Sequence, residues 1–145
     1  MGLTVRRLRS GDEALSRVAA TVFKTSDVSI THAARFLQNP ANYLIVAEMG
    51  SDLAGFALAY CLDRLDRAAA QLFVYEVAVL PRHQRQHVGT ALMEFLRDLV
   101  RLERFMEAFV LTNQGNEPAI SLFEKTGAKR EDDASILFVY PGDAA

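Results

Sequence analysis

The chain has 145 residues, half of them hydrophobic and 23% charged, which is the size and composition of one folded domain. Its 16 lysines and arginines against 18 aspartates and glutamates give a formal net charge of −2, which excludes the broad basic surface of a typical nucleic-acid-binding protein. No apolar stretch is long enough for a membrane span, and the N-terminus lacks a signal-peptide core. Cys61 is the only cysteine, so an internal disulfide and a multi-cysteine metal site are excluded. We therefore expect a cytoplasmic protein that binds neither nucleic acid nor a membrane.

The N-terminal part of the chain predicts a strand followed by two helices. Residues 3–9 alternate well enough for a strand. Ser10 and Glu13 fit a capping box, in which each side chain binds a free N–H at the start of a helix. That helix is expected to run to Lys24, and a second, short helix to end near Pro40, because proline disfavours helix in the residue before it.

The middle of the chain predicts three strands and a long helix. Runs rich in β-branched and aromatic residues indicate strands at 43–48, 53–62 and 72–80. Pro81 ends the third strand. From Val88 onward, apolar residues recur at helical spacing and form one stripe of an amphipathic helix.

The last part of the chain predicts a strand at 108–111, a helix at 118–125 and a final strand at 135–140. Proline in the first turn of that helix and Gly127 just past its end mark its limits. The order of elements predicts one mixed α/β domain over residues 1–145, because strand–helix–strand units favour parallel pairing.

The connection between strand 72–80 and the long helix is a candidate anion site. The first N–H groups of a helix have no intrahelical acceptor, and the helix dipole favours negative charge there. Arg82 and Arg85 add positive charge, and His83 and His87 add more when protonated. An ordinary helix start with solvated arginines is the alternative. The two histidines are four residues apart, but no further ligand completes a metal site, so we expect no metal.

Two motifs in this half of the chain resemble those of the GCN5-related N-acetyltransferase superfamily. Gln84-Arg-Gln-His-Val-Gly89 resembles the pyrophosphate loop [Gln/Arg]-x-x-Gly-x-[Gly/Ala]. Asn116-Glu-Pro-Ala-Ile-Ser-Leu-Phe-Glu-Lys-Thr-Gly127 resembles the Asn-x-x-Ala-x-x-Leu-Tyr-x-Lys-x-Gly motif. Within the superfamily, the chain is most similar to the small, acetyl-CoA-dependent aminoglycoside 3-N-acetyltransferases, whose Tyr-Asp-Leu-Ala-Val strand end resembles Tyr75-Glu-Val-Ala-Val79.

The resemblance implies a fold, a cosubstrate and a set of contacts. It implies a mostly antiparallel sheet with a parallel, splayed central strand pair that holds the pantetheine arm of acetyl-CoA. Backbone groups of Val77 and Val79 would pair with that arm, and the Val77 N–H would polarise the thioester carbonyl. Homodimers are a family expectation. The coenzyme-binding residues carried over from the family are Val77, Ala78, Val79, Gln84, Arg85, Gln86, His87, Val88, Gly89, Thr90, Asn116, Ala119 and Phe123.

Glu76 is the strongest catalytic candidate because it interrupts an apolar strand. Strict alternation predicts that its side chain shares a face with Leu72, Val74 and Ala78. A carboxylate at such a position costs desolvation free energy unless it has a partner or a task. It can bind a substrate ammonium and accept its proton, and the family carries an acid here. We therefore favour a general base over the alternative, a structural ion pair.

Acceptor recognition is expected to depend on acids, because a polycationic sugar requires several carboxylates. Solvated surface acids are the alternative for each one. In place of the Asp-x-Asp pair that the aminoglycoside enzymes carry near the C-terminus, this chain has Phe-Val-Tyr140, whose phenol offers a hydrogen bond but no negative charge. Besides Glu76, the candidates are Asp63, Asp66, Glu117, Glu124, Glu131, Asp132, Asp133 and Tyr140.

Two departures from the family motifs affect the coenzyme site. His87 replaces the first loop glycine, and its Cβ limits the approach of a phosphate, although the imidazole offers a donor. Phe123 replaces a tyrosine that protonates the departing thiolate in many relatives, which leaves water, another tyrosine or an unprotonated thiolate. The leading hypothesis is acetyl transfer to a primary amine, the 3-amino group of an aminoglycoside, which would inactivate the antibiotic. A peptide or protein amine, a polyamine and a non-catalytic acyl-CoA-binding role are the alternatives.

Overall fold

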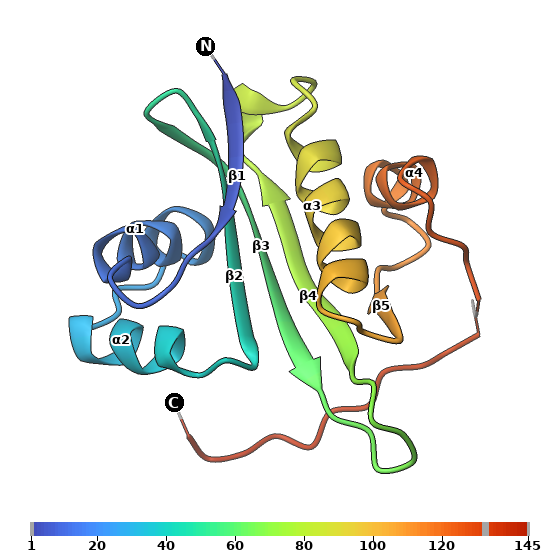
Figure 1. Cartoon of the computed structure of the whole chain (residues 1–145). Coiled ribbons are helices and arrows are strands. Elements are labelled where there is room, and N and C mark those ends of the chain that lie inside the picture. Colours follow the sequence, from blue (N-terminus) through green and yellow to red (C-terminus); the bar gives the residue numbers. More distant parts are fainter. Residues whose placement is uncertain (1, 132–133, 145) are drawn as a thin grey trace. The chain divides into compact units, whose positions relative to one another are not determined.

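The computed structural model describes residues 2–131 and 134–144 and forms two units, Met1–Leu111 and Thr112–Ala145. The first unit contains a five-stranded sheet in the order β1-β2-β3-β4-β5 (Figure 1). Neighbouring strands are antiparallel except β4 and β5, which are parallel. The expected mixed sheet with one parallel pair is confirmed. The strands are β1 (Leu3–Arg7), β2 (Asn42–Met49), β3 (Asp52–Leu62), β4 (Gln71–Val79) and β5 (Glu107–Val110).

The helices of the first unit lie on both faces of this sheet (Figure 1). On one face are α1 (Glu13–Lys24) and α2 (Ile30–Gln38), and on the other is α3 (Val88–Leu102), which connects β4 to β5. A short 3-10 turn over Pro81–His83 precedes α3. The second unit contains α4 (Glu117–Lys125).

Strand alternation divides the apolar side chains between two cores. The core under α3 includes Leu72 of β4 and Leu92 of α3, which are both fully buried. The core under α1 and α2 includes Phe56 of β3, whose ring stacks on Phe23 of α1 with 4.5 Å between centroids. Fully burying one such side chain stabilises the fold by about 1.5–3 kcal/mol. The two cores therefore fix the helices on opposite faces of the sheet.

Gly55 sets the close approach of α3 to the sheet. A Cβ at this position of β3 would lie 2.9 Å from the Ala78 carbonyl oxygen and 2.9 Å from Cγ1 of Val88. Both neighbours are part of the fold's core region, so neither has free space to yield. Glycine here lets the first turn of α3 lie directly against β3, beside the end of β4.

Two expectations about local structure are wrong. Asp12, not Ser10, is the N-cap residue of α1, and no side chain of the described residues caps the helix. Gly11 adopts a φ of 106°, which leaves Ser10 outside the first turn, while Glu13 accepts from the Gly11 N–H instead. The second wrong expectation is the strand at 135–140. Residues 134–144 contain no strand, because β-forming side chains give a strand only where a neighbouring strand pairs with them.

Candidate active site

The two halves of β4 differ in their neighbours. Gln71–Val74 pairs with β3 on one side and with β5 on the other, where Val74 pairs with Val110. β5 ends at Val110, so within the described part of the first unit residues 75–79 have a strand only on the β3 side. An open strand edge offers backbone donors and acceptors to an extended ligand. The expected pairing of a coenzyme arm with this edge stays a prediction.

A β-bulge at Tyr75 separates the two halves. Val74 pairs with Ala59, and Glu76 pairs with the adjacent Leu58, which leaves Tyr75 as an extra residue in β4. One inserted residue reverses the alternation of side chains between the two faces.

The bulge changes the face on which Glu76 lies. Leu72 and Val74 point into the core under α3, whereas Ala78 packs into the core under α1 and α2. Glu76 contacts Lys24 of α1 and therefore lies on the same side as Ala78. The expectation that Glu76 shares a face with Leu72 and Val74 is wrong, because it assumed alternation without a bulge.

The carboxylate of Glu76 is paired with an ammonium. Lys24, the last residue of α1, donates a hydrogen bond from Nζ to Oε1 of Glu76. The side chains of Lys24 and Glu76 remain 42% and 29% exposed. Ion pairs in such contact with water contribute about 0.2–1 kcal/mol to stability. The pair is thus weak enough for another ammonium to replace Lys24, and the role of Glu76 as a base stays a prediction.

Aromatic rings line the sheet beside Glu76. Tyr75 meets Tyr60 and Phe73 edge-to-face, with 5.8 Å between centroids in both pairs, and Tyr60 meets Phe36 of α2 at 6.5 Å. Burial raises the pKa of Tyr60, and the nearby Tyr75 and Glu76 raise it further. Tyr75 is 54% exposed, so part of this surface faces solvent. The sequence did not predict that these rings belong to the site. The spacing of Phe73 and Tyr75, two residues apart in a strand, was the available signal, because such residues lie on one face.

The loop before α3 has the backbone of an anion site. Arg85 and His87 both adopt a φ of 65°, in the left-handed region, and His87 is the N-cap residue of α3 without a side-chain cap. The N–H groups of Val88, Gly89 and Thr90 precede the first possible intrahelical bond of α3. Left-handed turns that lead into a helix collect such N–H groups around an anion. The backbone of this loop is therefore compatible with an anion, and its binding of pyrophosphate stays a prediction.

Two side chains, those of His83 and Gln84, fix the position of this loop. His83 is only 7% exposed, and its Nδ1 lies 3.1 Å from Oε1 of Gln86. Its Nε2 is buried, has no hydrogen-bond partner in the described structure and lies 3.9 Å from Oδ2 of Asp52. The amide of Gln84 donates to the Val79 carbonyl at 3.4 Å and joins the loop to the end of β4. His83 therefore positions the loop instead of facing a ligand.

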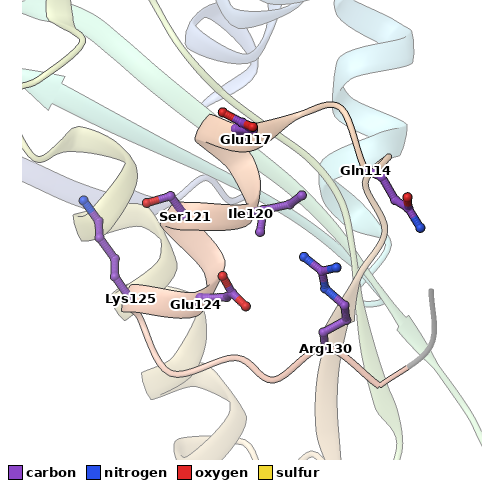
Figure 2. A pocket seen from close by; sticks show the side chains of 7 residues that line it. All are labelled: Gln114, Glu117, Ile120, Ser121, Glu124, Lys125 and Arg130. Atoms are coloured by element: carbon purple, nitrogen blue, oxygen red, sulfur yellow. The ribbon is translucent and has the colours of Figure 1, made fainter.

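The motif Asn116–Gly127 contains the residue that caps the start of α4. The side chain of Asn116 accepts from the Ala119 N–H at 3.3 Å and caps the helix. Phe123 is half-buried in this unit, and its carbonyl accepts from the Ala128 N–H at 3.0 Å. The same helix borders a hollow of about 630 Å³. Figure 2 shows the side chains that line it. Its lining residues are Gln114, Glu117, Ile120, Ser121, Glu124, Lys125 and Arg130.

Two of the predicted acceptor-binding acids, Asp63 and Asp66, lie in the loop after β3. This loop begins after Leu62, which is four residues, or roughly 13 Å along β3, from Leu58, the partner of Glu76. Asp66 is held by two hydrogen bonds from Arg64, at 2.9 and 3.0 Å, and this guanidinium lowers the pKa of the Asp66 carboxyl.

The remaining acceptor candidates belong to the second unit. Glu117 and Glu124 line the hollow on α4, and Glu131 is exposed. Tyr140 is 96% exposed. Asp132 and Asp133 lie outside the described residues.

Three further features of the described residues concern metal ligands, helix length and the single cysteine. In residues 2–131 and 134–144, no three histidine, cysteine, aspartate or glutamate side chains gather as metal ligands. Over the same residues, no helix has the length and apolar character needed to cross a membrane. Burial raises the pKa of the Cys61 thiol, which lowers the fraction present as the reactive thiolate near neutral pH.

Comparison with known proteins gives a family and a fold. The profile of the acetyltransferase (GNAT) family matches residues 13–128. No curated protein sequence matches the chain.

Many solved structures share the fold, and they include the following three. An aminoglycoside acetyltransferase, HMB0005, from an uncultured soil metagenomic sample has a TM-score of 0.87 at 24% identity, over 99% of this chain and 100% of that one. A second from such a sample, meta-AAC0020 in complex with sisomicin, has a TM-score of 0.84 at 23% identity, over 97% of each chain. AAC(6')-Iy in complex with a bisubstrate analogue of CoA and acetylneamine has a TM-score of 0.76 at 15% identity, over 97% and 99%.

Proposed function

Because the chain belongs to the acetyltransferase (GNAT) family, we propose that it transfers the acetyl group of acetyl-CoA to a primary amine, with Glu76 as the general base. The observation that carries this proposal is the contact between Glu76 and Lys24. A primary ammonium is already bound at the carboxylate, beside the half of β4 whose edge is open. The ammonium of an acceptor would bind there in the same way.

We propose that backbone groups bind the cosubstrate. The open edge of β4 would pair with the pantetheine arm through Val77 and Val79, while the loop from Gln84 to Thr90 would bind the pyrophosphate. Acetyl-CoA supplies an activated acyl group. The Val77 N–H would donate to the thioester carbonyl and stabilise negative charge on its oxygen as the amine attacks.

The proton route begins at Glu76. Its carboxylate would accept one proton from the bound ammonium, directly or through water, because only the neutral amine has a lone pair for attack. The amine then attacks the acetyl carbonyl, the C–N bond forms and the C–S bond breaks. Phe123 has no proton to give, so the departing thiolate would take the second amine proton through water.

The acceptor that we favour is an aminoglycoside, at its 3-amino group. Two of the enzymes with this fold are aminoglycoside acetyltransferases, and one of them was solved with sisomicin. A different feature favours a second acceptor class. The exposed ring of Tyr75, which packs on the partly buried ring of Tyr60 beside Glu76, fits an amine that carries an apolar group, such as a peptide amine, since a cation and a flat apolar surface are both accommodated there.

The test measures free thiol released from acetyl-CoA by the purified chain. The acceptors are gentamicin, kanamycin, spermidine and a lysine-containing peptide. Turnover with the two antibiotics, followed by mapping of the acetylated nitrogen, would establish the aminoglycoside and its position. Turnover with the peptide or spermidine alone would keep the mechanism and replace the acceptor. Binding of acetyl-CoA without turnover of any acceptor would favour the non-catalytic acyl-CoA-binding role.

A further inference from the structure

The position of Lys24 has a chemical consequence for the protein itself. The chain contains three lysines, Lys24, Lys125 and Lys129. Lys24 is the one whose ammonium is bound by the proposed general base. An acceptor amine in the proposed reaction must make the same contact. Lys24 therefore already makes the contact that the proposed reaction requires of an acceptor amine.

The backbone holds Lys24 in this place. It is the last residue of α1, and the next residue, Thr25, turns away with a φ of 51°. The Ser26 N–H donates to the Ala20 carbonyl at 3.1 Å and closes the end of the helix. Phe23, beside Lys24, stacks on Phe56 of the sheet. The helix end is thus anchored, while the side chain of Lys24 keeps enough exposure to move.

We propose that Lys24 is a self-acetylation site of this enzyme. The inference rests on the proposed function, because the same carboxylate and the same cosubstrate are used. Glu76 accepts one proton from the Lys24 ammonium, and the neutral Nζ attacks the acetyl carbonyl of bound acetyl-CoA. The C–N bond forms, the C–S bond breaks, the second Nζ proton goes to the thiolate and the first is released from Glu76 to water. The products are N-acetyl-Lys24, free coenzyme A and one proton.

Acetylation would change the site that produced it. An acetylated Nζ is neutral and no longer forms an ion pair with Glu76. The carboxylate then has no internal ammonium to lose when a cationic acceptor arrives. The modified enzyme should bind such an acceptor more tightly than the unmodified one.

The experiment incubates the full chain with acetyl-CoA and no acceptor, then maps acetyl groups by mass spectrometry after trypsin digestion. Trypsin does not cleave after acetyl-lysine, so peptides 18–24 and 25–35 merge into one peptide, 18–35, that carries an acetyl group. Lys125 and Lys129 in the same sample report uncatalysed acetylation. We expect Lys24 to react on the order of 100-fold faster than either of them, which is the usual contribution of a general base.

Two variants and a dilution make the test specific. Glu76→Gln should lower the rate at Lys24 to that of Lys125 and Lys129, and Lys24→Arg should remove the modified peptide. The fraction modified with time should not change when the protein is diluted, because the reaction is intramolecular. Dependence on dilution would overturn self-acetylation, and so would a Lys24 rate equal to that of the two control lysines while calorimetry shows acetyl-CoA bound.

The outcome is separable from that of the proposed function. Turnover of an added amine with Lys24 unmodified would overturn the inference alone. Modified Lys24 with no added amine turned over would support the inference and defeat only the choice of acceptor. A chain that calorimetry shows not to bind acetyl-CoA, and that stays unmodified, would overturn both.

Discussion

The first and second halves of β4 belong to one continuous strand but differ in their neighbours and in what their side chains contact. Gln71–Val74 has strands on both sides and contributes Leu72 and Val74 to the core under α3. Within the described residues of the first unit, residues 76–79 have a neighbouring strand, β3, on one side only, and they carry Glu76 on the face of α1. The difference arises from two local events, the end of β5 at Val110 and the bulge at Tyr75.

The comparison shows that residues buried in a core and residues available for a reaction can lie only a few positions apart in one strand. The first half is stabilised by packing, and a change there should act on folding. The second half keeps an edge and a carboxylate in contact with solvent, and a change there should act on catalysis. The predictions below test whether these two kinds of effect can be separated.

The largest effect is expected from Glu76→Gln. The amide keeps the shape of the side chain but cannot accept the amine proton, so kcat should fall by about 100-fold or more. The midpoint of urea unfolding and the Kd for acetyl-CoA should stay close to those of the wild type, because the ion pair with Lys24 is partly exposed. Glu94→Gln, an exposed change on α3, is the control and should leave kcat unchanged. Equal kcat in Glu76→Gln and the wild type would contradict the role of the base.

Leu72→Ala should give the opposite result. Leu72 is fully buried under α3, so truncation leaves a cavity and should lower the free energy of unfolding by about 2–5 kcal/mol. Below the unfolding transition, kcat per folded molecule should remain near the wild-type value. Urea unfolding and acetyl transfer are measured on the same samples. A loss of kcat in folded protein as large as that of Glu76→Gln would show that the two halves are not separable.

Most of the secondary structure was predictable because long apolar patterns specify helices and strands. The stripe from Val88 predicted α3, and the paired motifs predicted the position of the loop. The face of Glu76 was not predictable, since a one-residue bulge leaves the apolar pattern of β4 unchanged but reverses its alternation. The pairing partner of Glu76 was not predictable either. Lys24 comes from a helix 52 residues away in sequence, and only tertiary packing brings the two together.

The wrong expectations have the same kind of cause. The apolar segment at 135–140 has a strand composition, but composition does not tell whether another strand pairs with it. Ser10 has the spacing of a cap, yet the φ of Gly11 decides which residue begins α1. The separation of Asp63 and Asp66 from Glu76 also depends on how far β3 extends beyond Leu58, the partner of Glu76, which a list of acidic residues does not contain.

A smaller effect is expected from His87→Gly in the loop that follows the second half. His87 has a left-handed φ of 65°, which costs a side-chain-bearing residue about 1–2 kcal/mol. Glycine should therefore raise the free energy of unfolding by about 1 kcal/mol and, with no Cβ in the way, lower the Kd for acetyl-CoA. Arg85→Gly is the matched control. It relieves the same φ but removes a positive charge, so it should stabilise the fold and weaken binding. If His87→Gly also weakens binding, the imidazole donates to the phosphate.

The smallest effect is expected in the alkaline titration of two tyrosines, Tyr43 and Tyr60, which lie on opposite faces of the sheet. Burial, together with the hydrogen bond to Glu103, raises the pKa of Tyr43 to about 12. An unfolded tyrosine ionises near pH 10, so the stability contributed by neutral Tyr43 is present below about pH 10 and lost as the pH rises through 12. Tyr43→Phe should remove that part of the alkaline loss.

Tyr60 provides the contrast, because its raised pKa depends in part on Tyr75 and Glu76. In Glu76→Gln the pKa of Tyr60 should fall, since the negative charge that opposes ionisation is gone, whereas Tyr43 in the core under α3 should not change. Phenolate absorbance followed against pH in the wild type, Glu76→Gln and Tyr43→Phe separates the two groups. A shift of Tyr43 in Glu76→Gln would place the carboxylate on the α3 side of β4 and would contradict the reversal at the Tyr75 bulge.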